Sequence, residues 1–229
     1  MDGRAPRDIV EYPVRDGRPM AEHDRHCKEM QHYAIDVLDD FFARSPLVYV
    51  SGNNFVYFTE GNPKDSVSPD CYVVRGVGKG DRGTFKVWVE GARPCFALEV
   101  TSKKTRREDL GDKMAKYRDD LLLPEYFLFD PTGDWIDEHL RAFRLSEGVY
   151  QKLAFDPRGR LQSRELGLEV ALVAGHVRFF EPGAAEPLPT RMERIERGER
   201  ERARADAAEQ ELAKLREQLA RLERESGGK

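Results

Sequence analysis

The stretch Pro94-Cys95-Phe96-Ala97-Leu98-Glu99-Val100 is almost continuously apolar after its opening proline. Runs of this kind are typical of a central strand that is buried on both faces of a sheet. Residues 106–121 follow as a polar helix with a modest apolar stripe, and residues 126–129 predict a second buried strand that ends at Asp130-Pro131. The succession of buried strand, helix and buried strand predicts an α/β domain.

The segments on either side of this centre extend the same pattern. Residues 23–43 carry apolar side chains on one stripe and predict an amphipathic helix. Further short strands are predicted at residues 47–50, 55–58, 71–74, 140–145, 149–155, 168–173 and 177–180. The strands at 140–145 and 149–155 flank Ser146-Glu147-Gly148, which predicts a hairpin.

Length and composition indicate one folded domain with an appendage. The chain has 229 residues, of which 39% are hydrophobic, 10% aromatic and 35% charged. The apolar fraction suffices for a core, while the high charged fraction points to an exposed helix or tail. We expect an N-terminal extension at residues 1–22, a folded domain at 23–181, a Pro/Gly linker at 182–189 and a charged helical tail at 190–229.

The tail shows the spacing of a short coiled coil. Its apolar residues alternate by three and four, as the a and d positions of a heptad do: Ala205, Ala208, Leu212, Leu215, Leu219 and Leu222. Met192 and Ile195 fall outside this register, so only about two and a half heptads are regular. The segment is therefore either a solvated charged helix or a weak oligomerisation helix, and the second possibility predicts a homodimer.

Charge and cysteine content exclude several classes of protein. The formal net charge of −4 excludes a nonspecific polycation, so nucleic acid would have to contact a local basic patch. The three cysteines, Cys27, Cys71 and Cys95, form no CxxC pair and no even framework, which disfavours a disulfide scaffold. No apolar run is long enough for a signal peptide or a membrane span. We expect a soluble cytoplasmic protein without membrane partners.

Two carboxylates stand where hydrophobic patterning does not explain them. Asp70 directly follows Pro69 at the start of a strand, and Glu99 interrupts the apolar run. A basic cluster comes next, formed by Lys103, Lys104, Arg106, Arg107, Lys113, Lys116 and Arg118. Carboxylates on adjacent strands with nearby lysines suit metal-assisted cleavage of a phosphodiester. The alternative is a structural salt bridge between Glu99 and Lys103 or Arg106, and spacing alone does not separate the two.

Five segments, in order, resemble one family. Ser68-Pro69-Asp70 followed by Glu99-Val100-Thr101-Ser102 resembles the PD…EVxS signature of the PD-(D/E)XK nuclease superfamily, and within it the Uma2 family of restriction-endonuclease-like proteins. The similarity continues through Asp109, Lys113 and Tyr117, which match that family's D-xxx-K-xxx-Y helix. The segments at 125–131 (EYFLFDP) and 163–168 (SRELGL) resemble its later motifs, so the resemblance covers residues 23–181.

The resemblance implies a restriction-endonuclease-like fold, with a mixed β-sheet core flanked by helices. It implies a hydrolase that cleaves DNA phosphodiester bonds as a metal-dependent endonuclease. Asp70, Glu99 and the backbone carbonyl of Val100 would bind Mg²⁺ or Mn²⁺. DNA would be the partner, and dimerisation would bring two active sites to the two strands of a duplex.

The sequence departs from the superfamily pattern at the catalytic lysine. The lysine of the E-x-K motif should follow Glu99 by two residues, where this chain has Thr101. Lys103 shares the Glu99 face if the strand continues, and Lys113 lies on the following helix, aligned with Asp109 and Tyr117. The resemblance to the family's helix motif makes Lys113 our first choice as a substitute and Lys103 our second. A site without a catalytic lysine would leave a catalytically weak or inactive nucleic-acid-binding protein, or a transposon-associated interaction protein that oligomerises through its tail.

Two weaker patterns have simpler structural interpretations. His23, His26 and Cys27 could bind zinc, but no further cluster completes a tetrahedral site, so polar residues at a helix start are the simpler interpretation. Gly76, Gly78 and Gly80 lack the spacing of a phosphate-binding loop and predict a flexible loop.

Overall fold

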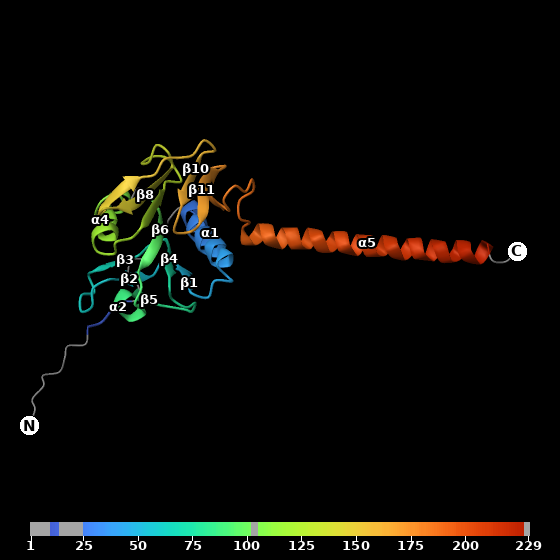
Figure 1. Cartoon of the computed structure of the whole chain (residues 1–229), viewed down its shortest axis with the longest axis horizontal. Helices are drawn as coiled ribbons and strands as arrows, with labels where there is room; N and C mark the ends of the chain where they lie inside the picture. The colour runs from blue at the N-terminus through green and yellow to red at the C-terminus, as the bar shows by residue number, and fades with distance from the viewer. Residues whose placement is uncertain (1–9, 14–24, 102–104, 227–229) are drawn as a thin grey trace, which may run out of the picture. The chain divides into compact units, whose positions relative to one another are not determined.

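The computed structural model describes the backbone of residues 10–13, 25–101 and 105–226, and the side chains of 10–13, 33–101 and 105–219 (Figure 1). The chain divides into two compact units, Met1–Leu188 and Pro189–Lys229. The first unit holds every strand in the described part of the chain, and the second contains one long helix.

A six-stranded mixed sheet forms the centre of the first unit. Its strands lie in the order β1 (Val48–Ser51), β4 (Cys71–Arg75), β6 (Pro94–Val100), β7 (Glu125–Phe129), β8 (Leu140–Ser146) and β9 (Val149–Lys152). β6 and β7 run parallel, whereas the other neighbours are antiparallel. All seven residues of β6 are buried, which confirms the predicted central strand.

Different elements cover the two faces of this sheet. One face packs against α1 (Arg25–Phe41) and a second sheet, made of β10 (Arg160–Ser163), β11 (Leu168–Val173) and β12 (His176–Phe180). The opposite face packs against Tyr117 of α4 (Asp112–Asp119) and against Leu121, which follows that helix. Because successive residues of a strand point to opposite faces, Ala97 and Glu99 of β6 belong to the α4 side.

A small third sheet lies beside the first strands of the chain. It contains β3 (Ser66–Val67), β2 (Phe55–Tyr57) and β5 (Thr84–Lys86), and the short helix α2 (Val87–Glu90) follows β5 directly. Its core residues, Val56, Val67 and Phe85, join the cluster on the α4 side of the central sheet. This sheet therefore extends the same hydrophobic core.

The predicted mixed α/β architecture is confirmed, with one correction in the helix after β6. The predicted helix at 106–121 is two shorter helices, α3 (Arg106–Asp109) and α4, which are separated at Leu110 and Gly111. Gly111 adopts φ −123° and ψ −102°, and an added Cβ would lie 2.7 Å from the carbonyl oxygen of Arg107. The chain bends where a side chain would collide with the preceding turn. β3, β5, β10 and α2, of two to four residues each, were not predicted, whereas the equally short β1 and β2 lie in the apolar runs predicted at 47–50 and 55–58.

The second unit contains α5 (Arg191–Ser226), the helix predicted for the tail. Its start is a capping box: the hydroxyl of Thr190 accepts a hydrogen bond from the backbone N–H of Glu193, and the Glu193 carboxylate accepts one from the N–H of Thr190. Its large apolar side chains are exposed, among them Leu212, Leu215 and Leu219. Within the described residues, no helix combines the length and apolar character needed to cross a membrane.

Candidate active site

Asp70 and Glu99 are brought together by the pairing of β4 with β6. Cys71 is aligned with Leu98 across this antiparallel pair, so one further step places Asp70 opposite Glu99. The backbone N–H of Val100 donates a hydrogen bond of 2.7 Å to Oδ2 of Asp70. The two carboxylates that the sequence singled out therefore lie at the same end of two neighbouring strands.

The turn between β1 and β2 fixes the backbone of Asp70 from the other side. The N–H of Asn53 donates a hydrogen bond of 2.8 Å to the carbonyl oxygen of Pro69. Gly52 passes so close that an added Cβ would lie 2.0 Å from the carbonyl oxygen of Asp70 and 2.8 Å from Cδ1 of Ile35. Only glycine permits this approach, so the segment Ser51-Gly52-Asn53 sets the position of Asp70.

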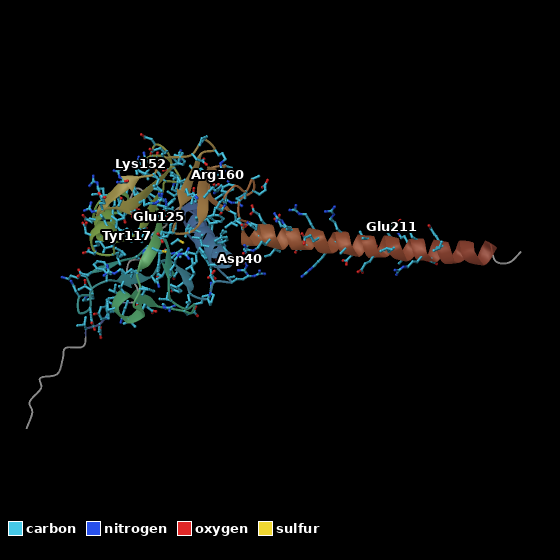
Figure 2. All side chains as sticks on the ribbon, viewed as in Figure 1. Asp40, Tyr117, Glu125, Lys152, Arg160 and Glu211 are labelled. Carbon is cyan, nitrogen blue, oxygen red and sulfur yellow. The ribbon has the colours of Figure 1, made fainter. Side chains whose placement is uncertain are left out.

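Glu99 is held by two side chains of α4. The ammonium of Lys113 lies 2.6 Å from Oε2 of Glu99, and the hydroxyl of Tyr117 donates a hydrogen bond of 2.5 Å to Oε1. Glu99 and Tyr117 are buried, and the side chain of Lys113 is only 12% exposed. Lys113 and Tyr117 are one helical turn apart, so a single face of α4 reaches both oxygens of the carboxylate. Figure 2 labels Tyr117 on α4.

Asp109 and Thr101 form a second pair beside the first. The hydroxyl of Thr101 donates a hydrogen bond of 2.7 Å to Oδ2 of Asp109, and Oδ1 of Asp109 lies 3.8 Å from Nζ of Lys113. The hydroxyl of Tyr126 also donates to the backbone oxygen of Asp109. Thr101 thus supplies no cation at the E-x-K position, but it holds the carboxylate that flanks Lys113.

Only one of the two candidate lysines lies within the described residues. Lys113 reaches Glu99, as the helix spacing predicted. Lys103, the second choice, lies outside the described residues. The alternative interpretation predicted a structural salt bridge between Glu99 and Lys103 or Arg106. In the structure, Glu99 pairs with Lys113 instead.

The electrostatics of the site follow from its burial and its surplus of carboxylates. Desolvation raises the pKa of Glu99 well above its usual value; Lys113 opposes this rise, and the negative charges of Asp70 and Asp109 add to it. Desolvation also raises the pKa of Asp70. Burial alone would lower the pKa of Lys113, but the three surrounding carboxylates raise it, so its ammonium stays protonated. A further positive charge beside these residues would therefore stabilise the charged forms of the carboxylates.

The donor set of this cluster fits a hard divalent cation. Asp70 and Glu99 offer carboxylate oxygens, the ligands that Mg²⁺ and Mn²⁺ prefer. No group of three or more His, Cys, Asp or Glu side chains suited to a metal occurs among the residues whose positions are described. A pair of carboxylates suffices for Mg²⁺, which keeps several of its water ligands in protein sites.

Another buried carboxylate, Glu125, has a structural role. It accepts hydrogen bonds from Arg144 at 2.8 Å and from the hydroxyl of Ser163 at 2.5 Å, and the N–H groups of Arg164 and Glu165 also donate to it. These bonds tie β7 to the turn between β10 and β11. The two later segments of the family resemblance, at 125–131 and 163–168, therefore meet in one hydrogen-bonded cluster.

The remaining sequence candidates lie away from this cluster or outside the described residues. The carboxylate of Asp130 accepts hydrogen bonds from the N–H groups of Thr132, Trp135 and Ile136, which confirms a turn at the end of β7. Gly76 and Gly80 lie in an open loop after β4. His23 and the side chains of His26 and Cys27 lie outside the described residues.

One residue of the site, Gly52, was not predicted. In the sequence, Gly52 is recognisable only as part of the turn signal Ser51-Gly52-Asn53-Asn54. That signal predicts a break between two strands, and it contains nothing that points to the backbone of Asp70.

Comparison with known proteins agrees with the sequence motifs. The Uma2 family, described as "Putative restriction endonuclease", matches residues 5–175, which is most of the chain. No curated protein matches the sequence. Among solved structures, the chain is similar to a "putative nuclease belonging to DUF820" from Anabaena variabilis, with 12% identity, a TM-score of 0.47, and coverage of 65% of this chain and 76% of that one. The extent of the sequence match shows that the chain belongs to the Uma2 family.

Proposed function

We propose that this protein is a metal-dependent endonuclease that hydrolyses phosphodiester bonds of DNA. One observation carries the proposal: Asp70 and Glu99 lie together at the ends of β4 and β6, and Lys113 contacts Glu99 at 2.6 Å. Two carboxylates and one fixed ammonium are the groups that metal-assisted phosphodiester cleavage needs. Membership of a family described as "Putative restriction endonuclease" supports the same class of reaction.

Asp70, Glu99 and the backbone carbonyl of Val100 would hold the metal, with Mg²⁺ or Mn²⁺ as the ion. When bound there, the ion would lower the pKa of a coordinated water and neutralise charge on the phosphate. The raised pKa values of Asp70 and Glu99 support this assignment: burial is their main cause, the negative charge of Asp109 adds to it, and a divalent cation would favour the charged form of both carboxylates.

Lys113 would act as a fixed positive charge. Its ammonium stays protonated because Glu99, Asp70 and Asp109 raise its pKa, so it is unsuited to act as a general base. A protonated ammonium stabilises the negative charge that develops on a phosphate oxygen during in-line attack. Asp109 and Tyr117 would act as positioning residues: Asp109 flanks the ammonium, and Tyr117 orients the carboxylate of Glu99.

Basic side chains beside the site would contact the DNA backbone. Arg106 and Arg107 lie on α3, and the guanidinium of Arg106 is stacked 3.7 Å above the centre of the Trp135 ring. Contacts of arginine and lysine with phosphate give affinity without sequence information, which suits a protein whose net charge is −4.

One observation favours a second candidate, a nucleic-acid-binding or transposon-associated interaction protein without cleavage activity. The E-x-K position holds Thr101, whose hydroxyl is engaged by Asp109, and Lys113 is engaged by Glu99. Such a protein would bind DNA in a salt-sensitive manner and leave it intact.

The proposal is tested by incubating supercoiled plasmid with the full chain in Mg²⁺, in Mn²⁺ and in EDTA. We expect nicked or linear DNA with metal and none with EDTA, and we expect Asp70→Asn to abolish cleavage. Asp134→Asn, an exposed aspartate in the turn after β7, is the matched control and should cleave like the wild type. Intact plasmid with either metal, together with a salt-sensitive gel shift, would establish the binding protein instead. A single-stranded RNA incubated under the same conditions distinguishes the two classes of nuclease. A deoxyribonuclease leaves the RNA intact, whereas a ribonuclease cleaves it.

A further inference from the structure

We propose that α5 pairs with α5 of a second copy of this chain, and that the two helices run antiparallel around a centre between Leu212 and Leu215. The proposal concerns the second compact unit and does not depend on the chemistry of the first. It makes the protein a dimer through an interface that the tail supplies alone.

The exposed apolar side chains between residues 205 and 219 of α5 include one regular seam, whereas Met192 and Ile195 lie outside it. We define the seam as Ala205, Ala208, Leu212, Leu215 and Leu219, which repeat at steps of three and four along the helix. Its leucines are 51%, 53% and 57% exposed in the single chain. Side chains stand out from α5 as far as residue 219, Glu211 among them (Figure 2). A helix that is polar elsewhere gains its main packing energy by burying such a stripe.

Charges beside the seam make a second copy the fitting partner. The flanking positions hold Arg204, Glu209, Glu211 and Arg216, so both signs are present on one helix. Flanking residues of this kind set partner choice through ion pairs between helices. In the antiparallel arrangement Glu209 of one copy lies opposite Arg216 of the other, and this contact occurs twice. A partner helix that carried charges of only one sign would repel the two flanking residues of α5 that have the same sign.

The apolar layers distinguish the two possible directions. In a parallel, in-register pair the flanking charges would also match, as Arg204 with Glu209 and Glu211 with Arg216. A parallel pair, however, would stack Ala208 on Ala208 and Leu212 on Leu212, so the layers would change in width along the seam. The antiparallel pair places Ala208 against Leu219 and Leu212 against Leu215. Leucine opposite alanine in the outer layers makes those layers closer in width to the central leucine layers than alanine opposite alanine would.

The oligomeric state of the full chain tests the pairing. Sedimentation equilibrium over a range of concentrations should give a monomer–dimer equilibrium for the wild type. Leu215→Asp should weaken dimerisation by more than about tenfold, because it places a carboxylate in the central layer. Gln210→Asp adds the same charge on the side of the helix away from the seam and should dimerise like the wild type. A monomeric wild type at every concentration, or an undisturbed dimer in Leu215→Asp, would overturn the proposal.

Charge exchange tests the direction. Glu209→Lys should weaken the dimer in either direction. Adding Arg216→Glu should restore it only if the helices are antiparallel, because the ammonium introduced at position 209 of one copy then faces the carboxylate introduced at position 216 of the other. Adding Arg204→Glu to Glu209→Lys should restore it only in a parallel pair. Rescue by Arg204→Glu and not by Arg216→Glu would overturn the antiparallel arrangement. Plasmid cleavage by each variant is read separately, so loss of pairing and loss of nuclease activity are distinguished.

Discussion

The ammonium of Lys113 lies 2.6 Å from Oε2 of Glu99, although the two residues are 14 positions apart in the chain. The contact links a strand that is buried along its whole length to the first turn of α4. A positive charge therefore reaches the strand carboxylate from α4, while Thr101 occupies the position expected of the lysine. The site depends on how α4 packs on the central sheet.

Replacing Lys113 should remove most of the cleavage activity. Lys113→Met keeps the aliphatic stem and removes the ammonium, so we expect the cleavage rate to fall by about 10²-fold or more, as for other losses of a group that stabilises developing charge. The rate is measured on supercoiled plasmid at saturating Mg²⁺. Lys116→Met, on the same helix with its ammonium on the backbone oxygen of Ser66, is the matched control. A larger loss in Lys103→Ala than in Lys113→Met would refute the role given to Lys113.

The hydroxyl of Tyr117 should matter through Glu99. Tyr117→Phe removes one of the two hydrogen bonds that orient this carboxylate, and outer contacts of this kind typically change metal affinity or activity by about 10- to 100-fold. The measured quantity is the Mn²⁺ concentration that gives half-maximal cleavage, which should rise.

Tyr126→Phe is the control for this substitution. Its ring lies 4.9 Å from that of Tyr117, but its hydroxyl donates to the backbone oxygen of Asp109 and not to a carboxylate. It should lower stability with little change in the Mn²⁺ requirement. Equal behaviour of the two variants would show that the Tyr117 hydroxyl has no special function.

Gly52 should tolerate no side chain. A methyl group there would lie 2.0 Å from the carbonyl oxygen of Asp70, so Gly52→Ala must displace the turn or the Asp70 backbone. We expect a loss of about 2 kcal/mol or more in the free energy of unfolding and a marked loss of cleavage. Gly78→Ala, with open space around the added methyl, should change the free energy by no more than about 0.5 kcal/mol. Urea unfolding of both variants provides the comparison.

The carboxylate of Asp130 should make stability depend on pH. Burial alone would raise its pKa, but hydrogen bonds from the Trp135 and Ile136 N–H groups and from Thr132 lower it below the value in the unfolded chain. A lowered pKa contributes stability above the unfolded-state value, which is about 3.9, and this contribution is lost as the pH falls through the folded-state value.

The variant Asp130→Asn isolates that contribution. It should be less stable than the wild type by about 1–3 kcal/mol at pH 7, because it loses a charged acceptor of several hydrogen bonds. The difference should shrink as the pH approaches the folded-state pKa, where the wild-type carboxyl is protonated. Urea unfolding at a series of pH values measures it, and a difference that is independent of pH would contradict the assignment.

Much of the fold and part of the site could be predicted from sequence patterns. The apolar runs at β6 and β7 and the stripe of α1 identify their elements because burial imposes a period on the sequence. The position of Glu99 in such a run marked it as a candidate site residue, with a structural ion pair as the alternative. Short elements such as β3 and β5 have too few residues to show a period.

The rest of the site depends on contacts between distant segments. Nothing local indicates that Gly52 must approach Asp70, or that Thr101 would bind Asp109. The helix spacing of Asp109, Lys113 and Tyr117 placed these residues on one face, yet Gly111 breaks the helix within that stretch. Their common direction results from the packing of α3 and α4 on the sheet.

Binding of Mn²⁺ to the full chain is the most direct test of the claim that Asp70 and Glu99 form a metal site. Isothermal titration calorimetry without DNA should show a site in the wild type and in Asp134→Asn. The same site should be lost or strongly weakened in Asp70→Asn and Glu99→Gln, while Lys113→Met should retain it, because Lys113 is not a ligand. Unchanged Mn²⁺ binding in both Asp70→Asn and Glu99→Gln, in variants that remain folded, would contradict the account.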